Sequence, residues 1–152
     1  MKTGRTLPQA FIYAWRGFIY TWRTQPNMRI HFAAGITVAA AGRWVGLLAV
    51  ETAVVWLAVG LVICVEALNT AVETAVDLAS RERHPLARRA KDVAAGAVLW
   101  AVVVAVAVGI WVFGPHLAGL PAVLRHQWLT APWQIGAVLF SVAALLFSGL
   151  RR

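Results

Sequence analysis

An uncharged apolar run, Val93 to Phe113, constrains this chain more than any other feature. A membrane-crossing helix needs about 20 consecutive apolar residues, because the bilayer offers no water to its backbone groups. The whole chain agrees with this reading, since 61% of its residues are hydrophobic and only 13% are charged. Soluble domains have about 45–50% apolar and about 25% charged residues. We therefore expect an all-α integral membrane helical bundle, and not a soluble or disordered protein.

Three further segments are predicted to cross the membrane. Met28–Leu48 and Trp133–Leu150 have nearly the required length and composition. Thr52–Val65 is uncharged but too short alone, so its helix must continue through polar residues as far as Asp77. The prediction is thus four transmembrane helices.

The segment 7–27 precedes these spans and predicts an amphipathic helix lying on the membrane surface. Its aromatic side chains alternate with Arg16 and Arg23, as interfacial helices require. Pro26 is expected to end this helix or to turn it into the first span. The aromatic residues are Phe11, Tyr13, Trp15, Phe18, Tyr20 and Trp22.

The basic residues predict the orientation. If the N-terminus is cytoplasmic, 12 of the 14 Lys and Arg residues lie inside, and only Arg43 and Arg125 lie outside. Four spans then return the C-terminus to the cytoplasm of a bacterial inner membrane. We expect a membrane domain over residues 1–113, and an external loop (Gly114 to Pro132) with an additional C-terminal transmembrane helix over residues 114–152.

Composition and motifs also exclude several functions. The net charge of +8 suggests nucleic acid, but a nucleic-acid-binding protein would not carry so much apolar mass. Cys64 is the single cysteine, so an internal disulfide and a CxxC zinc or redox site are excluded. The phosphate-binding loops and catalytic motifs of soluble kinases and hydrolases are absent. His31 and His84 are interpreted as isolated loop or interface residues.

A polar stripe within the third predicted span is the candidate site. At about 100° per residue, Glu66, Asn69, Glu73 and Asp77 fall within an arc of about 80° on one helix face. Ionisable residues at membrane depth are costly and are functional candidates. Carboxylates this close together stay ionised only if a cation shares the site. Oxygen ligands without a Cys/His set favour Mg²⁺ or Mn²⁺ over zinc.

A basic segment, RERHPLARRAKD, follows the acidic stripe directly. A divalent cation beside Lys91 and these arginines would provide the positive charge needed to bind a polyphosphate. The alternative is a solvated helix end whose acids pair with the arginines. A second alternative is a small transporter or proton-relay subunit that uses Glu66, Glu73 and Asp77 as an acid chain.

The run EALNTAVETAVDL, followed by HPLA and AKDVAAGAVL, resembles the prokaryotic diacylglycerol kinase and undecaprenol kinase family. The segments YAWRGFIYTWRT and NMRIH match the same family, so the resemblance covers about Phe11 to Phe113. It implies a small membrane lipid kinase that moves the γ-phosphoryl of MgATP onto a lipid hydroxyl. It also implies three transmembrane helices with a surface helix, and a homotrimer with composite active sites.

The resemblance carries roles over to individual residues. Glu66 matches the general base, Asn69 a polar contact of the nucleotide, and Glu73 a metal ligand. Lys91 and Asp92 match contacts with the nucleotide. Asp77 and Tyr13 match further active-site positions, with Tyr13 on the nucleotide side.

Gln25 departs from the family pattern, because a metal-binding Glu is usual at this position. Its carbonyl oxygen is still a possible metal ligand, but it brings no charge. A weakened or inactive member of the same fold therefore remains an alternative. The predicted partners are lipid, ATP, Mg²⁺ and further copies of the chain, and no nucleic acid.

Overall fold

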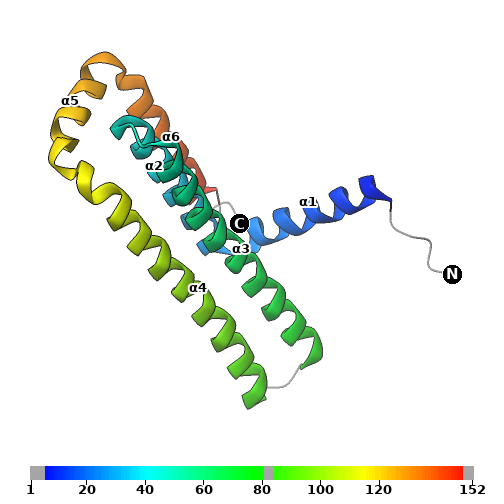
Figure 1. Cartoon of the computed structure of the whole chain (residues 1–152). Helices are drawn as coiled ribbons and strands as arrows, with labels where there is room; N and C mark the ends of the chain where they lie inside the picture. Colours follow the sequence, from blue (N-terminus) through cyan, green and yellow to red (C-terminus); the bar gives the residue numbers. More distant parts are fainter. Residues whose placement is uncertain (1–5, 81–83, 149–152) are drawn as a thin grey trace.

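A computed structural model describes residues 6–80 and 84–148, and this part of the chain contains helices and no strand (Figure 1). The chain order is α1 (Leu7–Thr24), α2 (Pro26–Val45), α3 (Ala49–Ala79), α4 (Pro85–Phe113), the 3₁₀ helix η1 (Gly114–Gly119), α5 (Leu120–Thr130) and α6 (Pro132–Phe147). The all-α prediction is therefore confirmed.

The junction between α1 and α2 is a sharp elbow. Gln25 has extended backbone angles and Pro26 lacks an N–H, so α1 ends here and a new helix begins. Figure 1 shows α1 leaving the bundle at a steep angle. The rings of Phe18 and Trp22 on α1 meet Phe32 on α2 edge-on, at centroid distances of 5.8 and 5.3 Å. These aromatic contacts hold the elbow in one geometry.

Helix α3 has 31 residues and confirms that the apolar segment continues through the polar stripe. At 1.5 Å per residue it is about 46 Å long, which exceeds the thickness of a hydrocarbon core. Its first turn is closed by Glu51, whose carboxylate accepts a hydrogen bond of 2.8 Å from the backbone N–H of Leu48. The excess length projects the acidic end of α3 beyond the apolar part of the bundle.

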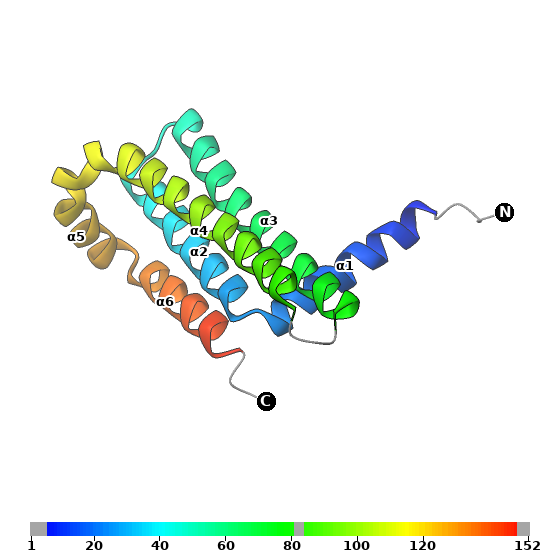
Figure 2. The same cartoon turned by 90° about the horizontal axis from the view of Figure 1, so that it is seen from below.

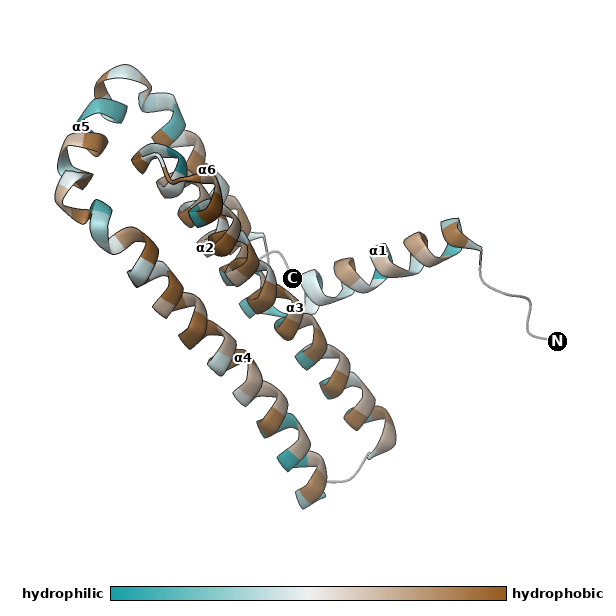
Figure 3. Ribbon diagram, viewed as in Figure 1, coloured by the Kyte–Doolittle hydropathy of each residue, from teal (hydrophilic) through white to brown (hydrophobic). Residues whose placement is uncertain are grey.

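Each of the consecutive helices α2, α3 and α4 runs antiparallel to the one before it, and α3 packs against both neighbours (Figures 1 and 2). Gly35 brings α2 close to α3, because a Cβ atom there would lie 2.8 Å from Cγ1 of Val59. Small residues permit this close packing in membrane bundles. Large apolar side chains such as Leu57, Ile110 and Trp111 are exposed on the outside of the bundle. In Figure 3, most of the bundle has the brown colour of hydrophobic residues.

Two helical stretches in the described chain, Ala49–Ala79 and Pro85–Thr130, are long and apolar enough to cross a membrane. The second stretch contains α4, η1 and α5. Helix α2 has 20 residues, and α6 is a shorter apolar helix of 16 residues. Two of the four predicted crossings are therefore supported by length and composition. Some of the basic residues used to predict the orientation lie at 1–5, 81–83 and 149–152, outside the described residues.

The segment between Gly114 and Pro132 differs from the loop expected for it, because most of it is helical. Its prolines suggest loop structure, but each occupies the first or second position of a helix, where a missing N–H costs nothing. The chain then returns as α6, which packs along α2. The indole Nε1 of Trp44 donates a hydrogen bond of 3.2 Å to Oε1 of Gln134, which joins the two helices.

Candidate active site

Glu73 lies at the centre of a hydrogen-bonded cluster where the elbow meets α3. Asn69, one turn earlier on α3, donates its Nδ2 to Oε1 of Glu73 at 3.1 Å. Gln25 donates its Nε2 to Oε2 of Glu73, also at 3.1 Å. Both carboxylate oxygens are therefore held by amide donors, which orients the carboxylate without neutralising its charge.

Glu66 lies almost two turns deeper on the same helix and is only 1% exposed. Neither of its carboxylate oxygens has a hydrogen-bond partner, and Oδ1 of Asn69 is likewise buried without one. The side chain of Asn27, from the first turn of α2, lies close to the Glu66 carboxylate but outside hydrogen-bonding geometry. A buried carboxylate without partners is costly, so this position needs a proton, a cation or a donating ligand.

The oxygen atoms of this cluster fit a magnesium ion. No group of three or more His, Cys, Asp or Glu side chains converges on one point in the described part of the chain. Mg²⁺ does not need such a cage, because it is usually bound by one or two carboxylates, substrate phosphates and water. Glu66 and Asn69 provide unpartnered oxygens, and Glu73 provides an oriented carboxylate. Gln25 presents its amide nitrogen to Glu73, so its expected role as a metal ligand through the carbonyl oxygen remains a prediction.

A second polar group lies further along, where α3 ends and α4 begins. Nζ of Lys91 lies 2.5 Å from Oδ1 of Asp77. Arg88 and Asp92 form a weaker, exposed pair one turn apart on α4, with 3.8 Å between Nε and Oδ2. Asp77 follows Glu66 by 11 residues, which is about 16 Å along the helix. A single chain therefore carries a buried acidic layer and a separate, solvated charged layer.

Tyr13, another predicted site residue, lies on α1 well before the elbow. Its side chain is 50% exposed on α1, and the guanidinium of Arg16 lies 6.0 Å from the centre of its ring. It precedes Gln25 by 12 residues, which corresponds to about 18 Å along α1. The structure thus joins Gln25, Asn69 and Glu73 directly, and pairs Asp77 with Lys91. Tyr13 contacts Arg16 on α1, and Asp92 pairs with Arg88 on α4.

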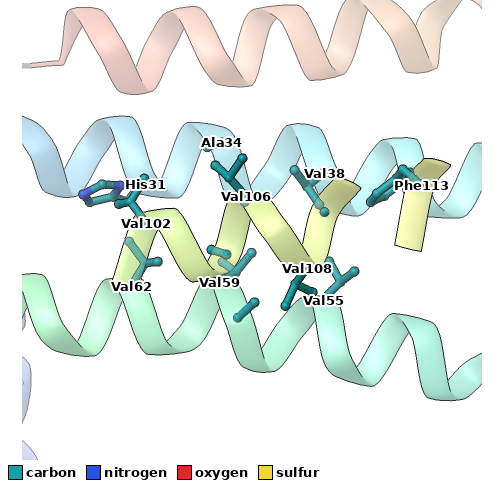
Figure 4. Close-up of a pocket in the computed structure, with 14 residues that line it drawn as sticks. His31, Ala34, Val38, Val55, Val59, Val62, Val102, Val106, Val108 and Phe113 are labelled. Carbon is teal, nitrogen blue, oxygen red and sulfur yellow. The ribbon is translucent and has the colours of Figure 1, made fainter. Parts of the chain in front are cut away.

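Two polar residues near the cluster were not predicted as site residues from the sequence. Asn27 lies beside Glu66, and His31 follows it by one turn of α2 with its Nε2 buried and without a partner. His31 was interpreted as a loop or interface residue, and the loop part of this interpretation is wrong, because His31 lies within α2 and lines an apolar cavity between α2, α3 and α4 (Figure 4). The segment NMRIH contains both residues, but its spacing alone does not show which helix they face.

The comparisons with known proteins cover the same part of the chain. The family model for prokaryotic diacylglycerol kinase matches residues 12–113. Undecaprenol kinase of Bacillus subtilis is 40% identical over 109 residues, which cover 72% of this chain and 89% of that protein. Diacylglycerol kinase of Escherichia coli K12 is 35% identical over 94 residues, covering 62% and 77% respectively.

A diacylglycerol kinase of Synechocystis is 46% identical over 112 residues, and the match covers 73% of this chain but 64% of that longer relative. The relatives thus carry two different acceptor names and share one kind of chemistry, lipid phosphorylation. The family match over residues 12–113 and the 40% identity to the Bacillus protein are sufficient to assign the chain to a family. The chain belongs to the prokaryotic diacylglycerol kinase family and is a membrane-bound lipid kinase.

Proposed function

We propose that this protein transfers the γ-phosphoryl group of ATP to the hydroxyl of a membrane lipid alcohol, undecaprenol or diacylglycerol, at the cytoplasmic face of the membrane. The observation that carries the proposal is Glu66, a carboxylate that is buried and unpartnered beside an oriented second carboxylate. A lipid hydroxyl is a poor nucleophile until a base accepts its proton, and a desolvated carboxylate is a suitable base.

The proposed reaction begins with the acceptor hydroxyl donating a hydrogen bond to a carboxylate oxygen of Glu66. The hydroxyl oxygen attacks the γ-phosphorus as its proton passes to Glu66. The bond between the γ-phosphorus and the bridging oxygen breaks, and ADP leaves with that electron pair. Glu66 later returns its proton to solvent. Positioning and charge stabilisation supply most of the catalysis in phosphoryl transfer.

The other cluster residues are assigned to the nucleotide. Asn69 and Gln25 hold Glu73 in a fixed orientation, and Glu73 would hold Mg²⁺. When bound, Mg²⁺ neutralises charge on the transferring phosphoryl group. Lys91 and Asp92 would contact the nucleotide, and Asp77 would orient Lys91 through the ion pair that already joins them.

A homotrimer with shared active sites is part of the proposal. Tyr13 precedes Gln25 by about 18 Å along α1 within one chain, so a neighbouring copy would bring the nucleotide contact assigned to Tyr13 to the site. We further propose that both termini face the cytoplasm of a bacterial inner membrane, where ATP and Mg²⁺ are available. The excess of basic residues on that side supports this orientation.

The test is transfer of labelled phosphate from γ-labelled ATP to purified undecaprenol and to diacylglycerol, in matched detergent micelles with Mg²⁺. The expected result is a labelled lipid phosphate from at least one acceptor, and the ratio of the two rates identifies the preferred lipid. Glu66→Gln is the negative control. Absence of product from both acceptors, with a folded protein, would contradict the proposed function.

A further inference from the structure

A separate pocket lies in the corner where α2 turns into α3, at the other end of the bundle from the acidic cluster. It has a volume of about 270 Å³. Thr52, which lines this corner pocket, precedes Glu66 by 14 residues, or about 21 Å along α3. In Figure 1 the turn between α2 and α3 lies near α5, at the end of the bundle remote from α1. The corner pocket therefore belongs neither to the acidic cluster nor to the solvated charged layer.

The lining of the corner pocket is amphiphilic. Its polar groups are the guanidinium of Arg43, near the end of α2, and the hydroxyl of Thr52, near the start of α3. The indole of Trp56 follows Thr52 by one helical turn and lines the same space. The apolar walls come from both helices and consist of Val38, Ala39, Leu47 and Val55. A ligand that matches this lining has an apolar part and a negatively charged group.

The guanidinium of Arg43 is an exposed donor group without an acceptor. It forms no ion pair and no side-chain hydrogen bond in the described part of the chain. Among the described residues, Glu51 is the one acid at this end of the bundle, and it is already engaged. Its carboxylate accepts a hydrogen bond from the N–H of Leu48, and it lies 3.9 Å from Nε2 of His116. The positive charge of Arg43 is therefore not neutralised within the described chain.

The hydroxyl of Thr52 is a further donor without a partner. Every other threonine within a described helix donates its hydroxyl to the carbonyl four residues earlier, as Thr37 does to Ala33 at 2.9 Å. Thr52 forms no such bond among the residues that the structure describes. A free hydroxyl can donate to an oxygen atom of a ligand. Two unpartnered donors from different helices thus line the same small space.

Exposed tryptophans mark the depth of this end of the bundle in the membrane. Indole rings concentrate at the membrane–water interface, at the level of the lipid head groups, because they have an apolar body and a polar N–H. Trp56 is one of these tryptophans and also lines the corner pocket, so the pocket lies at the depth of lipid phosphates. The exposed tryptophans at this end come from α3, α4, α5 and α6 and are Trp56, Trp111, Trp128 and Trp133.

We infer that the corner pocket binds the head group of an anionic glycerophospholipid, with the lipid phosphate against Arg43 and Thr52. A guanidinium donates two parallel hydrogen bonds to one phosphate, and basic pockets between transmembrane helices bind anionic lipids by this chemistry. The apolar walls contact the first methylenes of the lipid, which free inorganic phosphate lacks. In the proposed orientation this lipid belongs to the outer leaflet. It is then neither substrate nor product of the proposed reaction, and the inference does not depend on that reaction.

Three variants separate this site from general attraction to the membrane. Arg43→Gln removes the charge that lines the corner pocket. Arg125→Gln is the matched control, because Arg125 is exposed on α5 at the same end of the bundle but does not line the pocket. Thr52→Val removes the hydroxyl and leaves the charge in place. None of the three residues belongs to the proposed catalytic machinery.

The first measurement follows Trp56 by fluorine NMR. Protein labelled with fluorotryptophan is titrated with phosphatidylglycerol in dodecyl maltoside micelles, and Trp56→Phe identifies the signal. Phosphatidylglycerol should shift this signal saturably. Arg43→Gln should raise the half-saturating concentration roughly tenfold and Thr52→Val about threefold, the scales typical of charge-assisted and neutral hydrogen bonds. Arg125→Gln should leave it unchanged.

Three outcomes of this titration would overturn the inference. An equal shift with phosphatidylcholine would show that Trp56 senses any interface. Equal weakening by Arg43→Gln and Arg125→Gln would show that Arg43 only extends to the membrane surface, as basic side chains at helix ends do. The same shift with inorganic phosphate would show a site for the free anion and not for a lipid.

The second measurement is thermal unfolding in the same micelles. A ligand that binds only the folded protein raises its thermal midpoint. Phosphatidylglycerol should therefore stabilise wild type and Arg125→Gln to the same extent, and Arg43→Gln by a smaller amount. Equal stabilisation of all three proteins would place the bound lipid elsewhere and overturn the inference.

Discussion

Gln25 and Glu73 are 48 residues apart in the chain, yet the amide of Gln25 donates a hydrogen bond of 3.1 Å to the carboxylate of Glu73. This contact links the α1–α2 elbow to the acidic face of α3. Gln25 adds no negative charge to the cluster. It places a hydrogen-bond donor beside Glu73, whereas a Glu at this position would place a second carboxylate there. The metal dependence of the reaction should therefore depend on this single position.

Gln25→Glu should strengthen the dependence on Mg²⁺ and raise activity. Two facing carboxylates repel each other without metal, whereas a bound cation uses both as ligands. We expect a lower half-saturating Mg²⁺ concentration in initial-rate curves measured in one detergent. Gln25→Met, which has neither donor nor charge, is the matched control and should show no such gain. Superimposable curves for Gln25→Glu and wild type would show that Gln25 does not face the metal.

Glu66→Gln should lower kcat by about 10²–10³-fold, or ~3–4 kcal/mol, the range typical of general-base removal. The buried amide has nearly the shape of the carboxylate, so the fold and nucleotide binding should persist. Glu51→Gln is the control on the same helix, because glutamine can still accept the capping hydrogen bond from Leu48. Turnover near the wild-type rate in purified Glu66→Gln would remove this residue from catalysis.

Glu73→Asp and Asp92→Ala should impair the enzyme in different ways. Glu73 is the proposed metal ligand, so excess Mg²⁺ should partly restore the shortened carboxylate of Glu73→Asp. Asp92 is an exposed nucleotide-contact candidate, and its loss should raise KM for ATP without affecting thermal stability, since exposed pairs contribute little. Rates measured over a grid of Mg²⁺ and ATP concentrations separate the two effects. Identical dependences for both variants would contradict this assignment.

Removing residues 133–152 should leave kinase activity substantially intact but lower the thermal midpoint. The family match ends at residue 113, and no ionisable side chain is present in α6. However, α6 packs along α2, and Gln134 accepts a hydrogen bond from Trp44. Trp44→Phe should reproduce a small part of the thermal shift. A truncated protein that inserts and assembles but has no activity would show that α6 belongs to the catalytic assembly.

Gly35→Ala should destabilise the bundle by about 1–3 kcal/mol, the usual cost of overpacking. The new methyl group would lie 2.8 Å from Cγ1 of Val59, a stiff β-branched side chain that cannot swing aside. Val59→Ala should relieve the clash, so the double variant should unfold at a higher temperature than Gly35→Ala alone. Additive losses in a double-mutant cycle would mean that the two residues do not interact.

The continuation of α3 through Asp77 and the break at Pro26 were predictable because both depend on local chemistry. Helical periodicity places Glu66, Asn69 and Glu73 on one face whatever surrounds them, and α1 cannot continue unbroken through Pro26, which lacks an N–H. The segment 114–130 was harder to predict. Proline starts a helix as readily as it ends one, and only the chain after it decides which.

The amino-acid sequence by itself determined that this is a helical membrane protein with an acidic stripe at one end of a long helix. Hydrophobic length and helical period are properties of neighbouring residues, so they can be read from the chain. Only the tertiary structure decided that Gln25 donates to Glu73, that Glu66 is buried without a partner, and that His31 caps an apolar cavity. These relationships depend on the angle and spacing at which separate helices pack, which are set by side-chain contacts between residues distant in sequence.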